Sequence, residues 1–191
     1  GLHTGEPVTL TLRPAPIGHG YKFQRTDLEG EPIIPADADL VVSTERGTTL
    51  GKGDVRVNTT EHVLSALYAL GVDNCLLQLS GPEVPIMDAS AMPFVEAIES
   101  AGLDEQNAPR DWYELTEPIW FETKERGTEM LGVPAPGGEF RLTVMVDYNS
   151  PVLGTQHASM YRAEEFKTDI APCRTFVFLR ELELLAKAGL I

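Results

Sequence analysis

The chain has 191 residues, of which 42% are apolar and 23% are charged, as is ordinary for a globular protein that can bury a sizeable core. Its formal net charge of -14 at pH 7 argues against a nucleic-acid backbone or an anionic lipid surface as the main partner. A local basic pocket for a phosphate is still compatible with this charge. The apolar runs are too short for a transmembrane segment, and no N-terminal signal peptide is visible. Because the first residue is Gly1 rather than Met, we expect a processed chain or a fragment.

The two cysteines, Cys75 and Cys173, are too few for a disulfide framework, and the sequence contains no CxxC motif. This usage is typical of a reducing compartment. We therefore expect two free thiols that bind no metal.

Short β-type runs dominate the first half of the chain. The run Val8-Thr9-Leu10-Thr11-Leu12 alternates strictly between polar and apolar residues, which predicts a half-buried strand. A helix is predicted over residues 60–70, ending at Gly71, and a second over 93–101, with Pro93 at its first position and Gly102 just past its end. The predicted strands are residues 8–12, 21–25, 40–42, 48–50, 55–57 and 74–79.

The pattern restarts after a polar segment, residues 104–110, which is the best candidate for a linker. Strands are predicted over 114–123 and 140–147, joined through a turn rich in proline and glycine, and helices over 163–168 and 179–188. Runs of strands followed by helices, twice, predict an α+β fold of two units, residues 1–107 and 108–191. In each unit the helices would cover one face of a sheet.

The tripeptide Thr60-Glu61-His62, at the start of the first predicted helix, has two interpretations. Asn58 is a good helix cap, and Glu61 lies three residues later, where a capping-box acid reaches back to the cap. For the isolated pattern this structural interpretation is favoured. Alternatively, the carboxylate and the imidazole serve as general base and metal ligand in a hydrolase.

A metal site would need more than His62. The helix dipole favours the neutral imidazole near the N-terminus, which is the form that binds a metal. However, strong zinc signals are spaced pairs of ligands, and His3, His19 and His157 have no ligand-type residue at the needed spacing. From the residues alone, each of these three histidines is expected to be structural or solvated.

Four longer strings decide between the two interpretations. They are, in order, Gly1-Leu2-His3-Thr4-Gly5, Thr59-Thr60-Glu61-His62-Val63, Pro85-Ile86-Met87-Asp88-Ala89-Ser90 and Arg174-Thr175-Phe176. Any one of them is a weak signal, but four in this order at compatible spacing are specific. Over the whole chain, Gly1 to Ile191, the sequence closely resembles the UDP-3-O-acyl-N-acetylglucosamine deacetylases, the zinc amidases of lipid A biosynthesis.

The resemblance implies a fold and a set of roles. The fold would be two similar α/β sandwiches with helices packed between two outer sheets, the second one incomplete here. Glu61 would be the general base and His62 a zinc ligand, while Thr175 would help to hold the oxyanion. Phe176 and Phe178 would lie near the acyl and nucleotide parts of the substrate.

Structural alternatives remain open for the last two strings. Asp88 and Ser90 are expected to be polar loop residues before the second helix, and this role is favoured over a catalytic one. Phe176 and Phe178 alternate as in a strand, so that one of them is a candidate core residue. Arg174 could simply pair with an acidic neighbour.

The resemblance also implies the reaction and its setting. The substrate would be a UDP-linked acylated amino sugar, UDP-3-O-(3-hydroxyacyl)-N-acetylglucosamine, whose N-acetyl amide is hydrolysed in the cytoplasm. The two other zinc ligands are expected beyond Ile191, so we expect the chain alone to be inactive and to bind zinc weakly or not at all. Some members of the family are fused to a hydroxyacyl-carrier-protein dehydratase.

Two other functions are to be weighed against the enzyme. One is a non-catalytic module on the same scaffold that binds a nucleotide sugar or an acyl chain, although the presence of Glu61, His62 and Thr175 argues against it. The other is an unrelated α+β sandwich resembling a small-molecule kinase. That would need a glycine-rich phosphate loop, and Gly51-Lys52-Gly53 is too short and wrongly placed for one.

Overall fold

The computed structural model describes residues 1–125, 127–135, 137–179 and 182–183. It divides into two compact units. The first comprises Gly1–Ala108 together with the described residues from Lys167 onward, and the second comprises Pro109–Phe166. Helices and several small sheets occur together, which is compatible with the predicted α+β class. None of the helices in the described part of the chain is long and apolar enough to cross a membrane.

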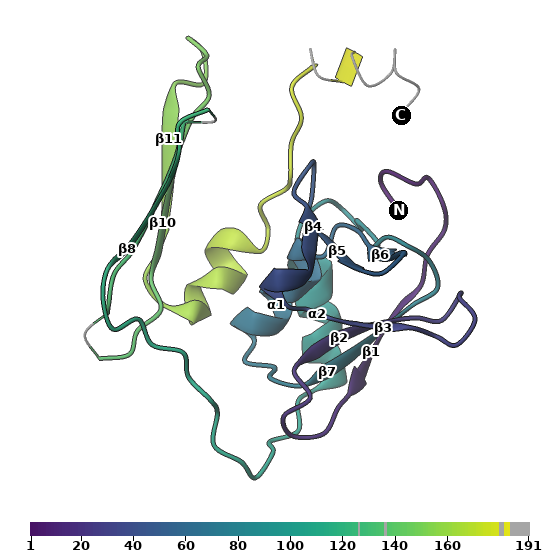
Figure 1. The fold of residues 1–191 in the computed structure, drawn as a ribbon. Helices are drawn as coiled ribbons and strands as arrows, with labels where there is room; N and C mark the ends of the chain where they lie inside the picture. Colours follow the sequence, from purple (N-terminus) through teal and green to yellow (C-terminus); the bar gives the residue numbers. More distant parts are fainter. Residues whose placement is uncertain (126, 136, 180–181, 184–191) are drawn as a thin grey trace. The chain divides into compact units, whose positions relative to one another are not determined.

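A four-stranded sheet forms the base of the first unit (Figure 1). Its strands are β1 (Leu10–Pro14), β2 (Tyr21–Arg25), β3 (Ile33–Pro35) and β7 (Cys75–Leu79), in the order β1-β7-β2-β3. Strand β2 runs parallel to β7, and the other neighbours are antiparallel. Cys75, Leu77 and Leu79 are buried while the residues between them are half-buried, so one face of the sheet lies in the core.

A smaller antiparallel sheet follows in the chain. After the single turn η1 (Ala38–Leu40) it comprises β4 (Val41–Ser43), β5 (Thr49–Lys52) and β6 (Val55–Val57). Leu50 pairs with Val57, and both side chains are buried. The β5–β6 turn passes through Gly53 at φ +59°, a conformation that favours glycine.

Two helices, α1 (Glu61–Ala69) and α2 (Met92–Ala101), pack against each other and on the four-stranded sheet (Figure 1). Each buries residues at helical spacing: Val63, Ala66 and Leu67 of α1, and Phe94, Val95 and Ile98 of α2. Burying each of the large apolar side chains contributes about 1.5–3 kcal/mol. This core fixes α1, whose first turn carries the Glu61-His62 pair.

The second unit contains two antiparallel hairpins, one of β8 (Ile119–Thr123) with β9 (Thr128–Gly132) and one of β10 (Leu142–Asp147) with β11 (Thr155–Met160). Large apolar side chains on them are exposed, among them Trp120 and Met145. A single 3-10 turn, η2 (Ala163–Glu165), and a π-type turn, η3 (Phe166–Ile170), follow β11.

Several elements differ from the prediction in their bounds or in their type. Strands β8 and β10 lie within the ranges predicted for them, whereas β3, β9 and β11 are absent from the predicted strands. The helix predicted over 163–168 is instead the irregular η2–η3 segment. Most of the helix predicted over 179–188 lies outside the described residues. The arrangement as two similar sandwiches stays a prediction.

Candidate functional site

Helix α1 does not begin with the predicted capping box. The residue before it is Thr60, whose side chain makes no capping hydrogen bond. Asn58 lies outside the helix: its Oδ1 accepts a hydrogen bond from Thr49 Oγ1 at 2.9 Å, and its Nδ2 donates to the carbonyl of Pro82 at 3.1 Å. The capping prediction was wrong because Thr59 adopts φ +58°, which turns the chain between Asn58 and the helix.

The carboxylate of Glu61 is instead held by a loop that is distant in sequence. Its Oε2 accepts a hydrogen bond from the backbone N–H of Thr48 at 2.8 Å. A Cβ atom on Gly47 would lie 3.1 Å from Glu61 Oε1, so the absence of a side chain there lets the loop approach the carboxylate closely. In the described part of the chain no hydrogen-bond donor reaches Oε1. Among the described residues, the carboxylate is therefore oriented through Oε2 alone.

The same loop also fixes the start of the helix. Thr60 donates two hydrogen bonds to the carbonyl of Thr48, from its backbone N–H at 3.2 Å and from its Oγ1 at 3.1 Å. Thr60 is fully buried. Thr48 thus donates to Glu61 and accepts from Thr60, and these reciprocal contacts restrict the orientation of the first helical turn.

His62 is half-buried on the first turn of α1, beside Glu61. Its carbonyl accepts a hydrogen bond from Ser65 Oγ at 2.9 Å. Over the described residues, no group of three or more His, Cys, Asp and Glu side chains could hold a metal ion. The described residues therefore do not form a metal site by themselves, and His62 follows Glu61 in the chain as a side chain that could contribute one ligand.

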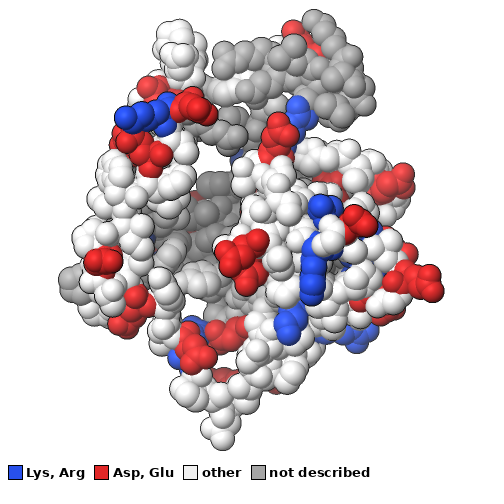
Figure 2. Space-filling view, viewed as in Figure 1, with Lys and Arg blue, Asp and Glu red and all other residues white. Residues whose placement is uncertain are grey.

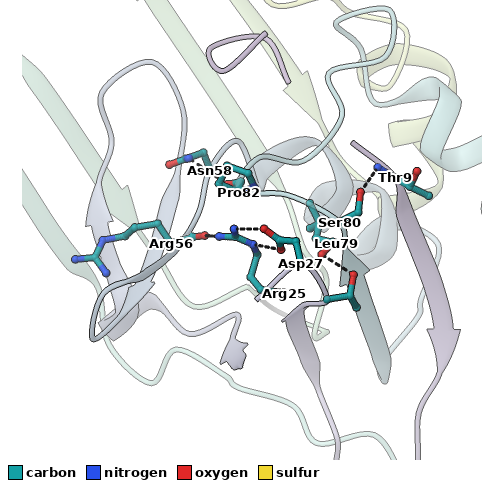
Figure 3. Close-up of polar contacts among 9 residues, drawn as sticks. Thr9, Arg25, Asp27, Arg56, Asn58, Leu79, Ser80 and Pro82 are labelled. Atoms are coloured by element: carbon teal, nitrogen blue, oxygen red, sulfur yellow. Dashed lines mark hydrogen bonds and ion pairs between the residues drawn. The ribbon is translucent and has the colours of Figure 1, made fainter. Parts of the chain in front are cut away.

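A buried arginine anchors the segment that leads into α1 (Figure 3). The guanidinium of Arg25, on β2, binds both carboxylate oxygens of Asp27, at 2.8 and 2.7 Å, and donates to the carbonyl of Arg56 at 2.7 Å. Only 6% of Arg25 is exposed. The hydrogen bond from Arg25 lowers the pKa of Asp27, so this carboxylate stays ionised and keeps the pair charged.

Asn58, two residues beyond Arg56, is hydrogen-bonded through its backbone to the segment that follows β7. The backbone N–H of Asn58 donates to the carbonyl of Pro82 at 2.8 Å, and the N–H of Val84 donates to the carbonyl of Asn58 at 3.0 Å. Figure 3 also shows the contact of Ser80 with the backbone of Thr9, at 2.9 Å. The segment that follows β7 is thus bound on one side to the start of the chain and on the other to the entrance of α1.

Between these contacts lies Glu83, which sequence reasoning did not identify. Its side chain is completely buried, and its carboxylate accepts hydrogen bonds from the backbone of residues 2–4 and from threonine hydroxyls. Burial alone would raise its pKa and is the largest single effect, but the hydrogen bonds from His3, Thr4 and Leu2 together outweigh it and lower the pKa. The signal in the sequence was an acid between apolar neighbours, in Pro82-Glu83-Val84.

Asp88 and Ser90 have the structural role that was favoured for them. Asp88 Oδ1 accepts hydrogen bonds from the backbone N–H of Ser90 at 3.0 Å and from its hydroxyl at 2.7 Å. Ser90 Oγ in turn accepts from the N–H of Met92, the first residue of α2. The hydroxyl of Ser90 is the main cause of a lowered pKa of Asp88, to which the positive charge of Arg174 also contributes.

Thr175 lies against this same loop. Its backbone N–H donates to the carbonyl of Ala89 at 2.9 Å, and the N–H of Ala91 donates to the carbonyl of Ala171 at 3.0 Å. The side chain of Thr175 is exposed. Within the described residues, no hydrogen bond joins Thr175 to Glu61 or His62.

The rings of Phe176 and Phe178 contact each other edge to face, with centroids 5.7 Å apart and an interplanar angle of 85°. Phe176 is 63% exposed and Phe178 is half-buried, and neither residue lies in a strand. The idea that one of them is a core residue was therefore wrong. Residues 174–178 belong to no strand and pair with none of the described strands, so their alternation reflects no strand pairing.

Comparison with known proteins decides the family. A family model described as "LpxC: UDP-3-O-acyl N-acetylglycosamine deacetylase" matches residues 1–191. The chain belongs to this deacetylase family. The resemblance drawn from the four strings is thereby confirmed.

Curated relatives in the deacetylase family extend further than this chain. A bifunctional enzyme LpxC/FabZ of Chlorobaculum tepidum is 50% identical over all of this chain and 41% of its own length. UDP-3-O-acyl-N-acetylglucosamine deacetylases of Myxococcus xanthus and Acidithiobacillus ferrooxidans are 44% and 42% identical, over 60% and 62% of their lengths. The chain therefore spans about two fifths of the bifunctional relatives and about three fifths of the other two deacetylases.

Proposed function

We propose that this chain carries part of the active site of a zinc-dependent deacetylase of lipid A biosynthesis. The substrate is UDP-3-O-(3-hydroxyacyl)-N-acetylglucosamine, and hydrolysis of its N-acetyl amide in the cytoplasm gives the free amine and acetate. Membership in the deacetylase family supports the reaction class. The observation that carries the proposal is the Glu61 carboxylate, which is held at one oxygen by Thr48 and accepts no hydrogen bond from the described residues at the other, on the residue that precedes His62 in the first turn of α1.

Glu61 acts as the general base in this proposal. An amide is a poor electrophile and water at neutral pH is a poor nucleophile, so a base that takes the proton from water as it attacks accelerates the reaction, typically by about 10²–10⁴-fold. Water adds to the amide carbonyl, the C–N bond breaks, and the departing amine takes up a proton from an acid outside the residues described. The hydrogen bond from Thr48 to Oε2 orients the Glu61 carboxylate, and Oε1, which lies near Gly47, accepts no hydrogen bond from the described residues.

Thr175 stabilises the negative charge that develops on the amide oxygen. Its hydroxyl is exposed and available as a donor, while its backbone is fixed to Ala89. Removing one such donor from comparable sites costs about 3 kcal/mol of transition-state stabilisation. The ring of Phe176, exposed beside Phe178, offers an apolar surface to the acyl or nucleotide part of the substrate.

His62 supplies one zinc ligand, and the remaining two come from residues outside the chain described here. A bound zinc ion would polarise the amide carbonyl and lower the pKa of water towards about 7. We further propose that the 191-residue chain alone is inactive and holds zinc weakly, since one imidazole beside one carboxylate is a poor set of ligands. The relatives named as bifunctional LpxC/FabZ enzymes support a fusion to a hydroxyacyl-carrier-protein dehydratase as one form of the whole protein.

The proposal is tested with the full-length protein that contains this chain. Zinc content and acetate release are measured for the wild type, for His62→Gln, and for His157→Gln, a histidine of β11 for which we propose no role. We expect His62→Gln to lose both zinc and turnover, and His157→Gln to keep both. Full zinc and turnover in His62→Gln would refute the role of His62. Substrate binding without turnover in the wild type would favour the non-catalytic module instead.

A further inference from the structure

We propose that Glu83 is a positioning residue for the Glu61-His62 pair, and that it acts through Thr59. This inference deepens the proposed function and rests on it for the role of the pair. Both carboxylate oxygens of Glu83 already accept hydrogen bonds, so Glu83 itself takes no part in proton transfer. Its function is to join three segments of the first unit at the entrance of α1.

The hydrogen bonds to Glu83 occupy both carboxylate oxygens. Oε1 accepts from the backbone N–H of Leu2 at 2.8 Å and of His3 at 3.0 Å, and Oε2 accepts from the N–H of Thr4 at 2.9 Å and from its hydroxyl at 3.0 Å. Successive backbone N–H groups that converge on one anion form a nest, which stabilises negative charge. A Cβ atom on Gly1 would lie 2.3 Å from Oε2, so a side chain there would displace the carboxylate from its present position.

Thr59 connects this buried carboxylate to the helix. Its Oγ1 donates to Glu83 Oε1 at 3.3 Å, and only 3% of the residue is exposed. Its φ of +58° is rare for a β-branched residue and persists only where the surroundings impose it. The hydrogen bond to Glu83 is a contact that holds the side chain of Thr59 in this strained conformation.

From Thr59 the constraint passes to the catalytic pair by direct contacts. Thr60, the next residue, donates twice to the carbonyl of Thr48, and the N–H of Thr48 donates to Glu61. A change in the backbone at Thr59 therefore displaces Thr60 from Thr48 and loosens the hydrogen bond that orients Glu61. If Glu83 merely tethered the start of the chain, the contact between Thr48 and Glu61 would be unaffected by its loss.

The test uses hydrogen exchange of single backbone amides in the full-length protein that contains this chain. Thr59→Val removes only the hydroxyl, Thr59→Ser keeps it, and Glu83→Gln keeps the shape of the side chain but places amide hydrogens against the donors. In Thr59→Val we expect exchange at the Thr48 amide to rise by about tenfold or more, while the amides of Leu2, His3 and Thr4 stay protected. Thr59→Ser should match the wild type, and Glu83→Gln should expose all four amides.

Unchanged protection of the Thr48 amide in both Thr59→Val and Glu83→Gln would overturn the inference. If Glu83→Gln does not fold, Thr59→Val decides alone. In the full-length protein, Thr59→Val should lower kcat about tenfold with KM within about twofold, because misplaced catalytic groups affect the reaction more than binding. The exchange result does not depend on catalysis. Suppose that exchange at the Thr48 amide rises in Thr59→Val, but that Glu61→Gln does not affect turnover. The structural link from Glu83 to Thr48 would then stand, and the proposed function would be refuted.

Discussion

The carboxylate of Glu61 accepts a hydrogen bond from the backbone N–H of Thr48, 13 residues earlier in the chain, at 2.8 Å. This contact replaces the capping box that the local sequence suggests. It changes the meaning of Glu61, because a capping acid would have turned back toward Asn58, whereas here one oxygen is oriented by a loop and the other accepts no hydrogen bond from the described residues. The orientation of this carboxylate is therefore set by a tertiary contact and not by the start of the helix.

The first prediction concerns the donor to Glu61. Thr48→Pro removes the backbone N–H but keeps the carbonyl that accepts from Thr60, and Thr48→Ala keeps both. We expect Thr48→Pro to lower kcat of the full-length protein about tenfold and to reduce the free energy of unfolding by about 1–3 kcal/mol. Thr48→Ala should change kcat by less than about twofold. Equal kcat in the two variants would show that this hydrogen bond does not orient Glu61.

Arg25 should be sensitive even to substitution by lysine. Lysine keeps the charge but cannot bind both oxygens of Asp27 while donating to the carbonyl of Arg56. We expect Arg25→Lys to lower the free energy of unfolding, measured by urea titration, by about 1–3 kcal/mol. Arg141→Lys is a matched control, since Arg141 and Glu139 form an exposed pair of the second unit. Figure 2 shows that both acidic and basic side chains occur on the surface of the molecule. A similar effect of both substitutions would contradict the role given to Arg25.

The stability of the first unit should depend on pH through Glu83. The pKa of Glu83 in the folded protein lies below its ordinary value of 4.5, so the folded state favours the ionised form. Its contribution to stability is complete above about pH 4.5 and is lost as pH falls through the lower, folded-state pKa. We expect the difference in urea midpoint between wild type and Glu83→Gln to be largest near neutral pH. The difference should shrink as the pH falls below about 4.5. A difference that is constant with pH, or grows in acid, would be inconsistent with this assignment.

Thr175 offers a test of oxyanion stabilisation that is separate from the base. Thr175→Val removes the hydroxyl and keeps the shape and the backbone contact with Ala89, whereas Thr175→Ser keeps the hydroxyl. We expect Thr175→Val to lower kcat of the full-length protein by about 10²–10³-fold, with a small effect on KM. Thr175→Ser should recover most of the rate. A rate of Thr175→Val within a few-fold of the wild type would exclude the hydroxyl as a donor in the transition state.

Elements whose pattern is local could be predicted from the sequence. The apolar positions of α1 and α2 recur at helical spacing, and Gly71 and Gly102 mark their ends, so both helices were found within two residues of their bounds. Strand β9 was not found because Thr128–Gly132 combines an acid and a glycine with little alternation, and its partner β8 determines it. The family and its four motifs were also accessible from sequence.

The supports of the site were not accessible in this way, because they depend on residues far apart in the chain. Nothing around Glu83 indicates that its carboxylate binds residues 2–4, some 80 positions earlier. The positive φ of Thr59 is similarly invisible in a sequence where threonine ordinarily indicates a strand or a cap. Tertiary contacts, rather than local propensity, determine both.

The central claim is that Glu61 serves as the base of an amide hydrolase, and acetate release tests it most directly. The full-length protein and its Glu61→Gln variant are incubated with UDP-3-O-(3-hydroxyacyl)-N-acetylglucosamine, and acetate and free amine are quantified together. We predict equal amounts of both products from the wild type, and a rate at least about 10²-fold lower for Glu61→Gln with substrate binding retained. Undiminished acetate release by Glu61→Gln, or none by the wild type with its zinc bound, would contradict the claim.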